Sequence, residues 1–209
     1  MQERHELGKV KDYFTDKLEA HGTTPRGVDW NSAESQEIRF FQLIKVIDSS
    51  KKYSLLDFGS GFGAMYDYLL CLGHDLHYIG YDFAVPMVEK GRELHLNNPD
   101  CWFTARIEEV PVVDYSAACG TFNMKLDANV DVWTEIVIES LHQMDAHSKK
   151  GFSFNLLTKY SDADRMRPDL YYGDPLFFFD HCKKNFSRNV ALLHDYKLYD
   201  FTLLIRKEE

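Results

Sequence analysis

The sequence lacks several features that mark whole classes of protein. No run of about eighteen apolar residues occurs, as a membrane-spanning helix would need, and the opening MQERHELGKVKDYF is charged where a signal peptide is apolar. The cysteines, Cys71, Cys101, Cys119 and Cys182, are widely spaced and form no C-x-x-C pair, which is typical of a reduced intracellular chain. No cluster of histidines or cysteines suits a metal. We therefore expect a cytoplasmic protein that binds neither a membrane nor a metal.

An excess of basic residues is also missing. The chain has 24 Lys and Arg against 33 Asp and Glu, so its formal net charge is −9 and no overall positive field attracts a polyanion. We expect no nucleic-acid partner. The length of 209 residues and the hydrophobic content of 44% suit one well-buried core, so a single compact domain is predicted.

Short apolar stretches alternate with stretches of helical periodicity. Asn31 and Glu34 have the spacing of a helix cap, and apolar residues then recur on one face as far as Ile47. Further helices are predicted near residues 65–72, 88–94, 133–144 and 175–186. Strands are predicted at residues 53–57, 77–82, 115–119, 151–157, 189–195 and 199–205, and another begins at Cys101. The last two strands are too close in sequence for a crossover helix, so they should form an antiparallel hairpin.

This alternation predicts an α/β fold with a doubly wound sheet of about seven strands. Most strands are expected to be parallel, with the final strand reversed. Such sheets bind ligands at the carboxyl ends of their strands. The irregular, charged segment at residues 161–173 is long enough to serve as a lid or an acceptor-binding loop.

The most informative stretch is LLDFGSGFGAM, residues 55–65, which follows the first predicted strand. Gly59, Gly61 and Gly63 supply backbone conformations and clearance that a Cβ would block, so a ligand can lie against the loop. Read loosely, the stretch also fits the G-x-G-x-x-G/A dinucleotide fingerprint. Asp57 stands at the strand end, where it would repel a pyrophosphate and attract an ammonium group, which favours a ligand that carries an amino acid.

The stretch LLDFGSGFG resembles the [DE]-x-G-x-G-x-G signature of class I S-adenosylmethionine (SAM) dependent methyltransferases. YIGYDFAVPMVEKG resembles the second motif of that family, and the likeness extends over residues 53–205. It implies SAM as the cofactor, methyl transfer as the activity, a SAM-binding methyltransferase domain at residues 51–209 and an N-terminal helical cap segment at residues 1–50. Residues 21–40 also resemble the N-terminal region of some bacterial small-molecule methyltransferases, which implies an acceptor such as a sugar or a natural-product intermediate.

The resemblance assigns roles to individual residues. Asp57 and the glycine loop would receive the methionine end of SAM, Asp82 would bind both ribose hydroxyls, and Phe83 would pack near the adenine. Where the family often has an acidic residue after the third strand, this chain has TARIEEV, so Arg106 and Ile107 would flank the adenine instead. Trp30 either lies against the cofactor, as part of a segment that folds over the strand ends, or packs as a staple for the following helix. With it, the expected cofactor-binding set is Trp30, Asp57, Gly59, Gly61, Gly63, Asp82, Phe83, Arg106, Ile107, Cys119 and Gly120.

The acceptor side carries no diagnostic motif. ACGTFNMK, after the fourth predicted strand, matches neither the D/N-P-P-Y/F motif of amino-methylating enzymes nor the Pro-Cys nucleophile of cytosine C5 enzymes. Candidates for catalytic residues are Asn123, Tyr160 and Tyr172, which should lie at the strand ends beside the cofactor. Because the chain is acidic and no appended recognition domain is recognised, the expected acceptor is a small molecule. The atom methylated and the oligomeric state stay open.

Two other functions fit parts of the sequence. An NAD-dependent oxidoreductase of the short-chain type needs a Tyr-x-x-x-Lys pair after the glycine loop, but the clean match, Tyr13 and Lys17, precedes it. The second alternative is a protein that binds SAM but has no transferase activity. The identity of the bound ligand distinguishes the oxidoreductase from the other two.

Overall fold

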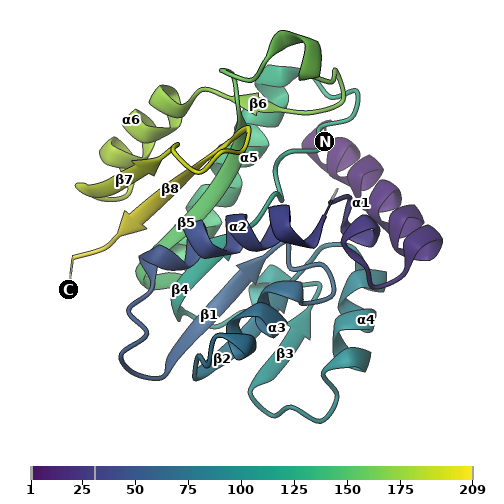
Figure 1. The fold of residues 1–209 in the computed structure, drawn as a ribbon, viewed down its shortest axis with the longest axis vertical. Helices are drawn as coiled ribbons and strands as arrows, with labels where there is room; N and C mark the ends of the chain where they lie inside the picture. The colour runs from purple at the N-terminus through teal and green to yellow at the C-terminus, as the bar shows by residue number, and fades with distance from the viewer. Residues whose placement is uncertain (1, 31, 209) are drawn as a thin grey trace.

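A computed structural model describes residues 2–30 and 32–208 of the chain and contains an open sheet with helices on both faces (Figure 1). The strands are β1 (Tyr53–Phe58), β2 (Leu76–Tyr81), β3 (Cys101–Thr104), β4 (Val113–Ala118), β5 (Ser148–Thr158), β6 (Tyr172–Gly173), β7 (Asn189–Leu193) and β8 (Asp200–Arg206). The α-helices are α1 (Gln2–His21), α2 (Ala33–Leu43), α3 (Ala64–Cys71), α4 (Val85–Leu94), α5 (Val130–Ala146) and α6 (Pro175–Asn185). Short 3-10 helices are η1 (Pro25–Val28), η2 (Ile44–Val46), η3 (Ile107–Glu109) and η4 (Ala163–Arg165).

The predicted sheet is confirmed. Its strand order is β3-β2-β1-β4-β5-β8-β7, and β1 pairs in parallel with both β2 and β4. β8 runs antiparallel to β5 and to β7, as expected from the short connection around Lys197. The two-residue strand β6 pairs with the end of β5 and lies at the end of the segment predicted to be irregular.

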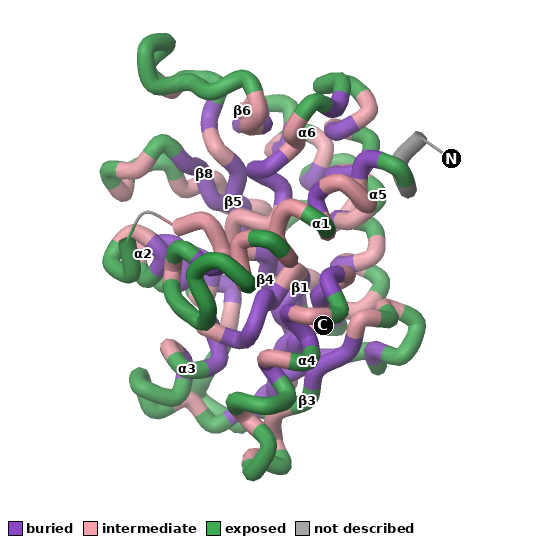
Figure 2. The backbone as a smooth tube through the Cα atoms, turned by 90° about the vertical axis from the view of Figure 1, so that its right-hand side faces the viewer, coloured by how far each residue is buried: buried purple, intermediate pink, exposed green. Residues whose placement is uncertain are grey.

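Alternate residues of the strands enter two cores. Leu56 and Phe58 of β1 pack in a cluster with α5 and α6, whereas Leu55 packs in a cluster with α2, α3 and α4. Successive side chains of a strand point to opposite faces, so a nearly continuous apolar run is the expected pattern for a strand covered on both sides. Figure 2 shows β1, β4 and β8 buried over most of their length, and exposed residues on the outer sides of helices and in loops. The edge strand β7 is only half-buried.

The N-terminal segment contributes to both cores. Val10 of α1 belongs to the cluster with α5, and Phe40 and Leu43 of α2 belong to the other cluster. The predicted cap residue Asn31 lies outside the described residues; the side chain of Ser32 caps α2 by accepting a hydrogen bond from the Ser35 N–H. The sequence predicted a helical segment here but not the bounds of α1.

No helix among residues 2–30 and 32–208 is long and apolar enough to cross a membrane. In the same part of the chain, no group of three or more His, Cys, Asp or Glu side chains is arranged to hold a metal ion.

Candidate functional site

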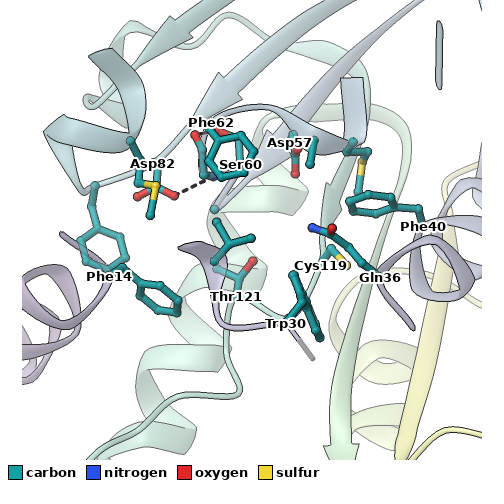
Figure 3. Close-up of a pocket in the computed structure, with 18 residues that line it drawn as sticks. Phe14, Trp30, Gln36, Phe40, Asp57, Ser60, Phe62, Asp82, Cys119 and Thr121 are labelled. Carbon is teal, nitrogen blue, oxygen red and sulfur yellow. Dashed lines mark hydrogen bonds between the residues drawn. The ribbon is translucent and has the colours of Figure 1, made fainter. Parts of the chain in front are cut away.

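A pocket lies at the carboxyl ends of β1, β2 and β4, beneath α1, η1 and α2 (Figure 3). Figure 3 shows Asp82 and Phe14 on one side of it and Gln36 and Phe40 on the other. Aromatic side chains crowd the pocket, and its cavity measures about 70 Å³. We call it the glycine-loop pocket; it is lined by Phe14, Val28, Trp30, Gln36, Phe40, Asp57, Gly59, Ser60, Gly61, Phe62, Ala64, Met65, Asp82, Phe83, Met87, Cys119, Gly120 and Thr121.

Two glycines let the loop after β1 lie against this pocket. Gly59 and Gly61 have φ angles of 80° and 55°, in the left-handed region that disfavours other residues. A Cβ at Gly59 would lie 2.4 Å from Cγ2 of Thr121, and one at Gly61 would lie 3.0 Å from Cγ1 of Val28. Side chains at these positions would therefore strain the loop and collide with the pocket lining.

Asp82 holds the glycine loop in place. It is 9% exposed, and its Oδ2 accepts a hydrogen bond of 2.9 Å from the Gly61 N–H while Oδ1 accepts one of 2.9 Å from the Ala84 N–H. Burial raises the pKa of Asp82 to about 6, although the two backbone donors oppose this rise. A carboxylate oxygen accepts more than one hydrogen bond, so Asp82 can still receive hydroxyl donors from a ligand.

Asp57 is a second buried carboxyl group in the lining. The Tyr78 hydroxyl donates a hydrogen bond of 2.5 Å to Oδ2, and Oδ1 has no hydrogen-bond partner among the described residues. Burial raises the pKa of Asp57 to about 7; the Tyr78 hydrogen bond opposes the rise and the charge of Asp82 adds to it. No cation pairs with Asp57 in the described part of the chain, so a ligand ammonium group would find an uncompensated carboxylate there.

Trp30 stands at the edge of the pocket against the loop after β4. A Cβ on Gly120 would lie 2.4 Å from Cζ2 and Cη2 of the Trp30 ring, so only glycine allows this approach. The Arg39 guanidinium lies over the same ring, 4.5 Å from its centroid, and forms a buried ion pair with Asp200. Asn155 links Asp200 to the loop, since its Nδ2 donates to Asp200 and its Oδ1 accepts from the Gly120 N–H at 2.8 Å. Arg39 therefore holds the Trp30 ring and Asn155 holds Gly120, and both are linked through Asp200.

Cys119 precedes this loop and also lines the pocket. Burial raises the pKa of its thiol well above the ordinary value of 9.0. A protonated, buried thiol is a poor nucleophile, so Cys119 contributes packing to the pocket wall.

A more apolar cavity of about 250 Å³ adjoins the glycine-loop pocket beneath α1 and beside α5. The two share Gly59, Phe83 and Thr121. We call the second one the Phe83 hollow; it is lined by Leu7, Val10, Phe58, Gly59, Tyr81, Phe83, Ile107, Thr121, Phe122, Trp133, Ile136, Glu139, Ser140 and Gln143. Of the two residues expected to flank an adenine, Ile107 lies in this lining.

Arg106 and Gly63 do not line these cavities. The Arg106 side chain is 71% exposed and pairs with Glu109 at 3.3 Å. Gly63, with a φ of 99°, occupies the N-terminal cap position of α3, and a Cβ there would lie 2.7 Å from Cζ of Phe103 in the core. The structure thus explains the third glycine of the motif by the packing of α3 against the sheet.

A third cavity, of about 400 Å³, lies on the other side of Trp30 and Gly120. It shares Phe14, Val28, Trp30 and Gly120 with the glycine-loop pocket. We call it the Lys197 pocket; its lining is completed by Asp29, Ser35, Arg39, Asn123, Met124, Leu157, Arg167, Leu170, Lys197, Leu198 and Tyr199.

Of the three residues predicted to be catalytic, Asn123 lines this pocket. Its Oδ1 accepts a hydrogen bond of 3.1 Å from the Leu157 N–H. Tyr160 is 57% exposed and Tyr172 accepts a hydrogen bond from the Arg167 N–H, and neither belongs to the lining of the three cavities. The structure therefore brings Asn123, but not the two tyrosines, to the lining of the Lys197 pocket.

No residue pattern in the sequence indicates most of the Lys197 pocket. Asp29 and Lys197 have positive φ angles of 61° and 58°, which no residue pattern announced. Tyr13 and Lys17, considered only as a dehydrogenase pair, both bind the Asp29 carboxylate, at 2.8 Å and 2.6 Å. They are spaced by one helical turn, so they reach the same group.

Comparisons with known proteins add the following. No known family description matches the sequence. The chain is 42% identical over 170 residues to the Mycobacterium tuberculosis (strain ATCC 25618 / H37Rv) protein named "Putative methyltransferase Rv1506c", covering 78% of this chain and 99% of that protein. Its fold resembles that of the Burkholderia thailandensis 1,6-didemethyltoxoflavin-N1-methyltransferase, whose crystal structure contains 1,6-didemethyltoxoflavin and S-adenosylhomocysteine. The TM-score is 0.67 at 16% sequence identity, and the match covers 98% of this chain and 90% of that chain. This chain also resembles the small RNA methyltransferase HEN1, with a TM-score of 0.58, 16% identity, and 82% and 26% of the two chains covered.

Proposed function

We propose that this chain, which belongs to the class I SAM-dependent methyltransferase family, transfers the methyl group of SAM to a small-molecule acceptor held in the Lys197 pocket. Family membership excludes the nicotinamide-dependent oxidoreductase that the glycine pattern left open. The binding modes and residue roles given below are parts of this proposal.

The observation that carries the proposal is the pair of buried carboxyl groups beside the glycine loop. Asp57 and Asp82 lie in one pocket, and burial raises the pKa of each. When ionised, two buried carboxylates near each other cost stability, and a ligand that supplies a cation and hydroxyl donors would offset that cost. SAM carries an ammonium group and ribose hydroxyls, which match an unpaired carboxylate and a carboxylate with free acceptor capacity.

The residues fit the cofactor as follows. Asp57 would bind the ammonium group, the loop from Gly59 to Gly61 would lie against the amino-acid chain, and Asp82 would accept the ribose hydroxyls. The adenine would enter the Phe83 hollow between Phe83 and Ile107, because that cavity is apolar and adjoins the pocket. The glycine-loop pocket, at about 70 Å³, is too small for the whole of SAM, since small-molecule sites measure roughly 300–1,000 Å³. Crowding side chains in the N-terminal cap segment, residues 1–50, would have to shift on binding.

When bound, SAM would supply a methyl carbon on a positively charged sulfur; the acceptor lone pair would bond to that carbon in line as the carbon–sulfur bond breaks and S-adenosylhomocysteine leaves. The work of this chain is then to align the acceptor and exclude water. Trp30 and Gly120 form the wall between the two pockets, and the Arg39–Asp200–Asn155 contacts hold that wall. Asn123 would orient the acceptor beside this wall, because its Oδ1 is bound to the Leu157 N–H and its Nδ2 is available to donate.

The volume of the Lys197 pocket and the net charge of the chain support a small acceptor. The Lys197 pocket, at about 400 Å³, lies within the range of small-molecule sites. The formal net charge of −9 disfavours a polyanion such as RNA. One solved neighbour acts on 1,6-didemethyltoxoflavin, whereas another is a small RNA methyltransferase, so acceptor size needs a direct test.

Calorimetric titration with S-adenosylhomocysteine and with NAD tests the cofactor. We expect micromolar binding of S-adenosylhomocysteine, no response to NAD, and a loss of about tenfold to a hundredfold in affinity for Asp82→Ala, which removes a charged acceptor. Binding of NAD alone would contradict the proposal. For the acceptor, methyl transfer from radiolabelled SAM is compared between a small-metabolite extract and total RNA; label in the RNA fraction alone would overturn the small-molecule assignment.

A further inference from the structure

The Lys197 pocket carries an unbalanced positive charge. Four charged side chains line it, and three of them have partners of opposite charge: Arg39 with Asp200, Arg167 with Asp169, and Asp29 with Lys17. The fourth, Lys197, is exposed and has no hydrogen bond or ion pair in the described part of the chain. A single cation is thus left uncompensated at the pocket, on a chain whose net charge is strongly negative.

Lys197 is held at the pocket by the backbone around it. It lies in the turn between β7 and β8 with a φ of 58°, a conformation that is costly for a residue with a side chain. The following residues, Leu198 and Tyr199, also line the pocket, and the Tyr199 hydroxyl donates a hydrogen bond to Asp162 at the start of the long loop. The hairpin and the loop therefore close the pocket together, with Lys197 at its rim.

Asn123 adds a hydrogen-bond donor to the lining. Asn123 is 8% exposed and turns its Oδ1 to the Leu157 N–H, so its Nδ2 is left to donate; a Cβ on Gly120 would lie 3.7 Å from that nitrogen. The negative charge of Asp29, the one carboxylate in the lining, is compensated by Lys17 at 2.6 Å, and the Tyr13 hydroxyl donates a hydrogen bond of 2.8 Å to it. A ligand that presents an oxygen acceptor can therefore receive a hydrogen bond from Asn123 and pair with the uncompensated charge of Lys197.

We propose that the acceptor is a small molecule with an apolar body and an acidic group, a carboxylate or a phosphate, which pairs with Lys197. This inference rests on the proposed function, because it takes the Lys197 pocket as the acceptor site. Asn123 donates to an oxygen of the acceptor nearer the Trp30–Gly120 wall. The apolar body lies against Met124, Leu157 and Leu170. The acidic group therefore sets the orientation in which the acceptor meets the cofactor.

Matched pairs of probes test this without knowledge of the natural acceptor. The protein is saturated with S-adenosylhomocysteine, and ligand-observed NMR titrations compare 4-hydroxybenzoate with 4-hydroxybenzamide and phenyl phosphate with phenol. We expect the acid of at least one pair to bind about threefold to tenfold more tightly than its neutral partner, as for a partly exposed charged hydrogen bond. The carboxylate and phosphate pairs distinguish the two kinds of acidic group.

Three variants test whether Lys197 causes the tighter binding of the acidic probe. Lys197→Met should abolish the preference, and Lys197→Arg should keep it. Lys51→Met, which removes the same charge from an exposed position just before β1, should also keep it. Equal binding of acid and neutral probes by the wild type, or a preference that survives in Lys197→Met, would overturn the inference. The affinity for S-adenosylhomocysteine is measured in each sample: if it is normal while the acid preference is absent, the inference fails and the cofactor assignment stands.

Discussion

Asp57 allows the clearest test of the site, because its burial should cost stability in the ligand-free protein. The substitution Asp57→Asn keeps the shape and the acceptor for the Tyr78 hydroxyl but removes the titrating group. With a pKa of about 7 in the folded chain against an ordinary value of 3.8, the carboxyl binds its proton more tightly when folded. Its contribution to stability is therefore fully present below about pH 4 and is lost as the pH rises toward 7.

The magnitude follows from this difference. Each unit of difference between the folded and unfolded pKa corresponds to about 1.36 kcal/mol, so the free energy of unfolding at pH 8 is lower than at pH 4 by at most about 4 kcal/mol. Local relaxation around the carboxylate reduces the expected loss to on the order of 2 kcal/mol. Asp57→Asn should remove this loss. The variant should then be more stable than the wild type at pH 8 and similar to it at pH 4.5.

Urea denaturation at pH 4.5, 6 and 8, with calorimetric titration of S-adenosylhomocysteine at pH 8, measures both sides of this argument. We expect the free energy of unfolding of the variant to vary less between pH 4.5 and pH 8, and its affinity for S-adenosylhomocysteine to fall at least tenfold because the ammonium loses its counter-charge. Tyr78→Phe, which leaves the carboxyl in place, serves as the control. An Asp57→Asn variant that retains full affinity, or that is less stable at pH 8 with an unchanged pH dependence, would refute the reasoning.

Other substitutions test neighbouring parts of the site. Gly61→Val should lower the free energy of unfolding by about 1–3 kcal/mol, because it places a branched side chain at a positive φ against Val28, and it should abolish binding of S-adenosylhomocysteine in calorimetry. Arg39→Met should cost about 3–5 kcal/mol in urea denaturation, since it leaves Asp200 buried without its partner; a cost below about 1 kcal/mol would contradict this. Tyr172→Phe should cost only about 0.5–1.5 kcal/mol, through the acceptor lost by the Arg167 N–H, and should leave the affinity for S-adenosylhomocysteine unchanged.

The sheet could be predicted from the sequence because its signals are local. Each strand is a short apolar run, such as Leu55 and Leu56 of β1, and each is followed by a helix whose apolar spacing is visible within a few turns. The glycine loop is also local, since three glycines fall within five residues. The residues that the resemblance assigns to the cofactor could therefore be grouped from the sequence, and eight of them line one pocket: Trp30, Asp57, Gly59, Gly61, Asp82, Phe83, Cys119 and Gly120.

Prediction was weaker where a residue's surroundings come from distant segments. The third glycine was interpreted as part of the ligand loop, whereas the clearance at Gly63 serves Phe103, forty residues further on. Tyr172 was placed beside the acceptor because it follows β5 in sequence, yet its hydroxyl binds the backbone of Arg167 within its own loop. Neither arrangement has a periodicity or a motif that the sequence displays.

The acceptor side illustrates the same limit most clearly. Asp29, Asn123, Arg167 and Lys197 come from four segments spread over most of the chain, and they meet only because the hairpin, the long loop and the N-terminal segment converge at one edge of the sheet. The net charge of the pocket depends on which of its charged residues are paired. Arg39, Arg167 and Asp29 each form an ion pair, so Lys197 alone gives the pocket its positive charge. A count of basic and acidic residues gives −9 for the chain and would predict that an anion is repelled. The pairing of those residues predicts the opposite at this one place, and the proposed preference for an acidic acceptor rests on that pairing rather than on the total charge.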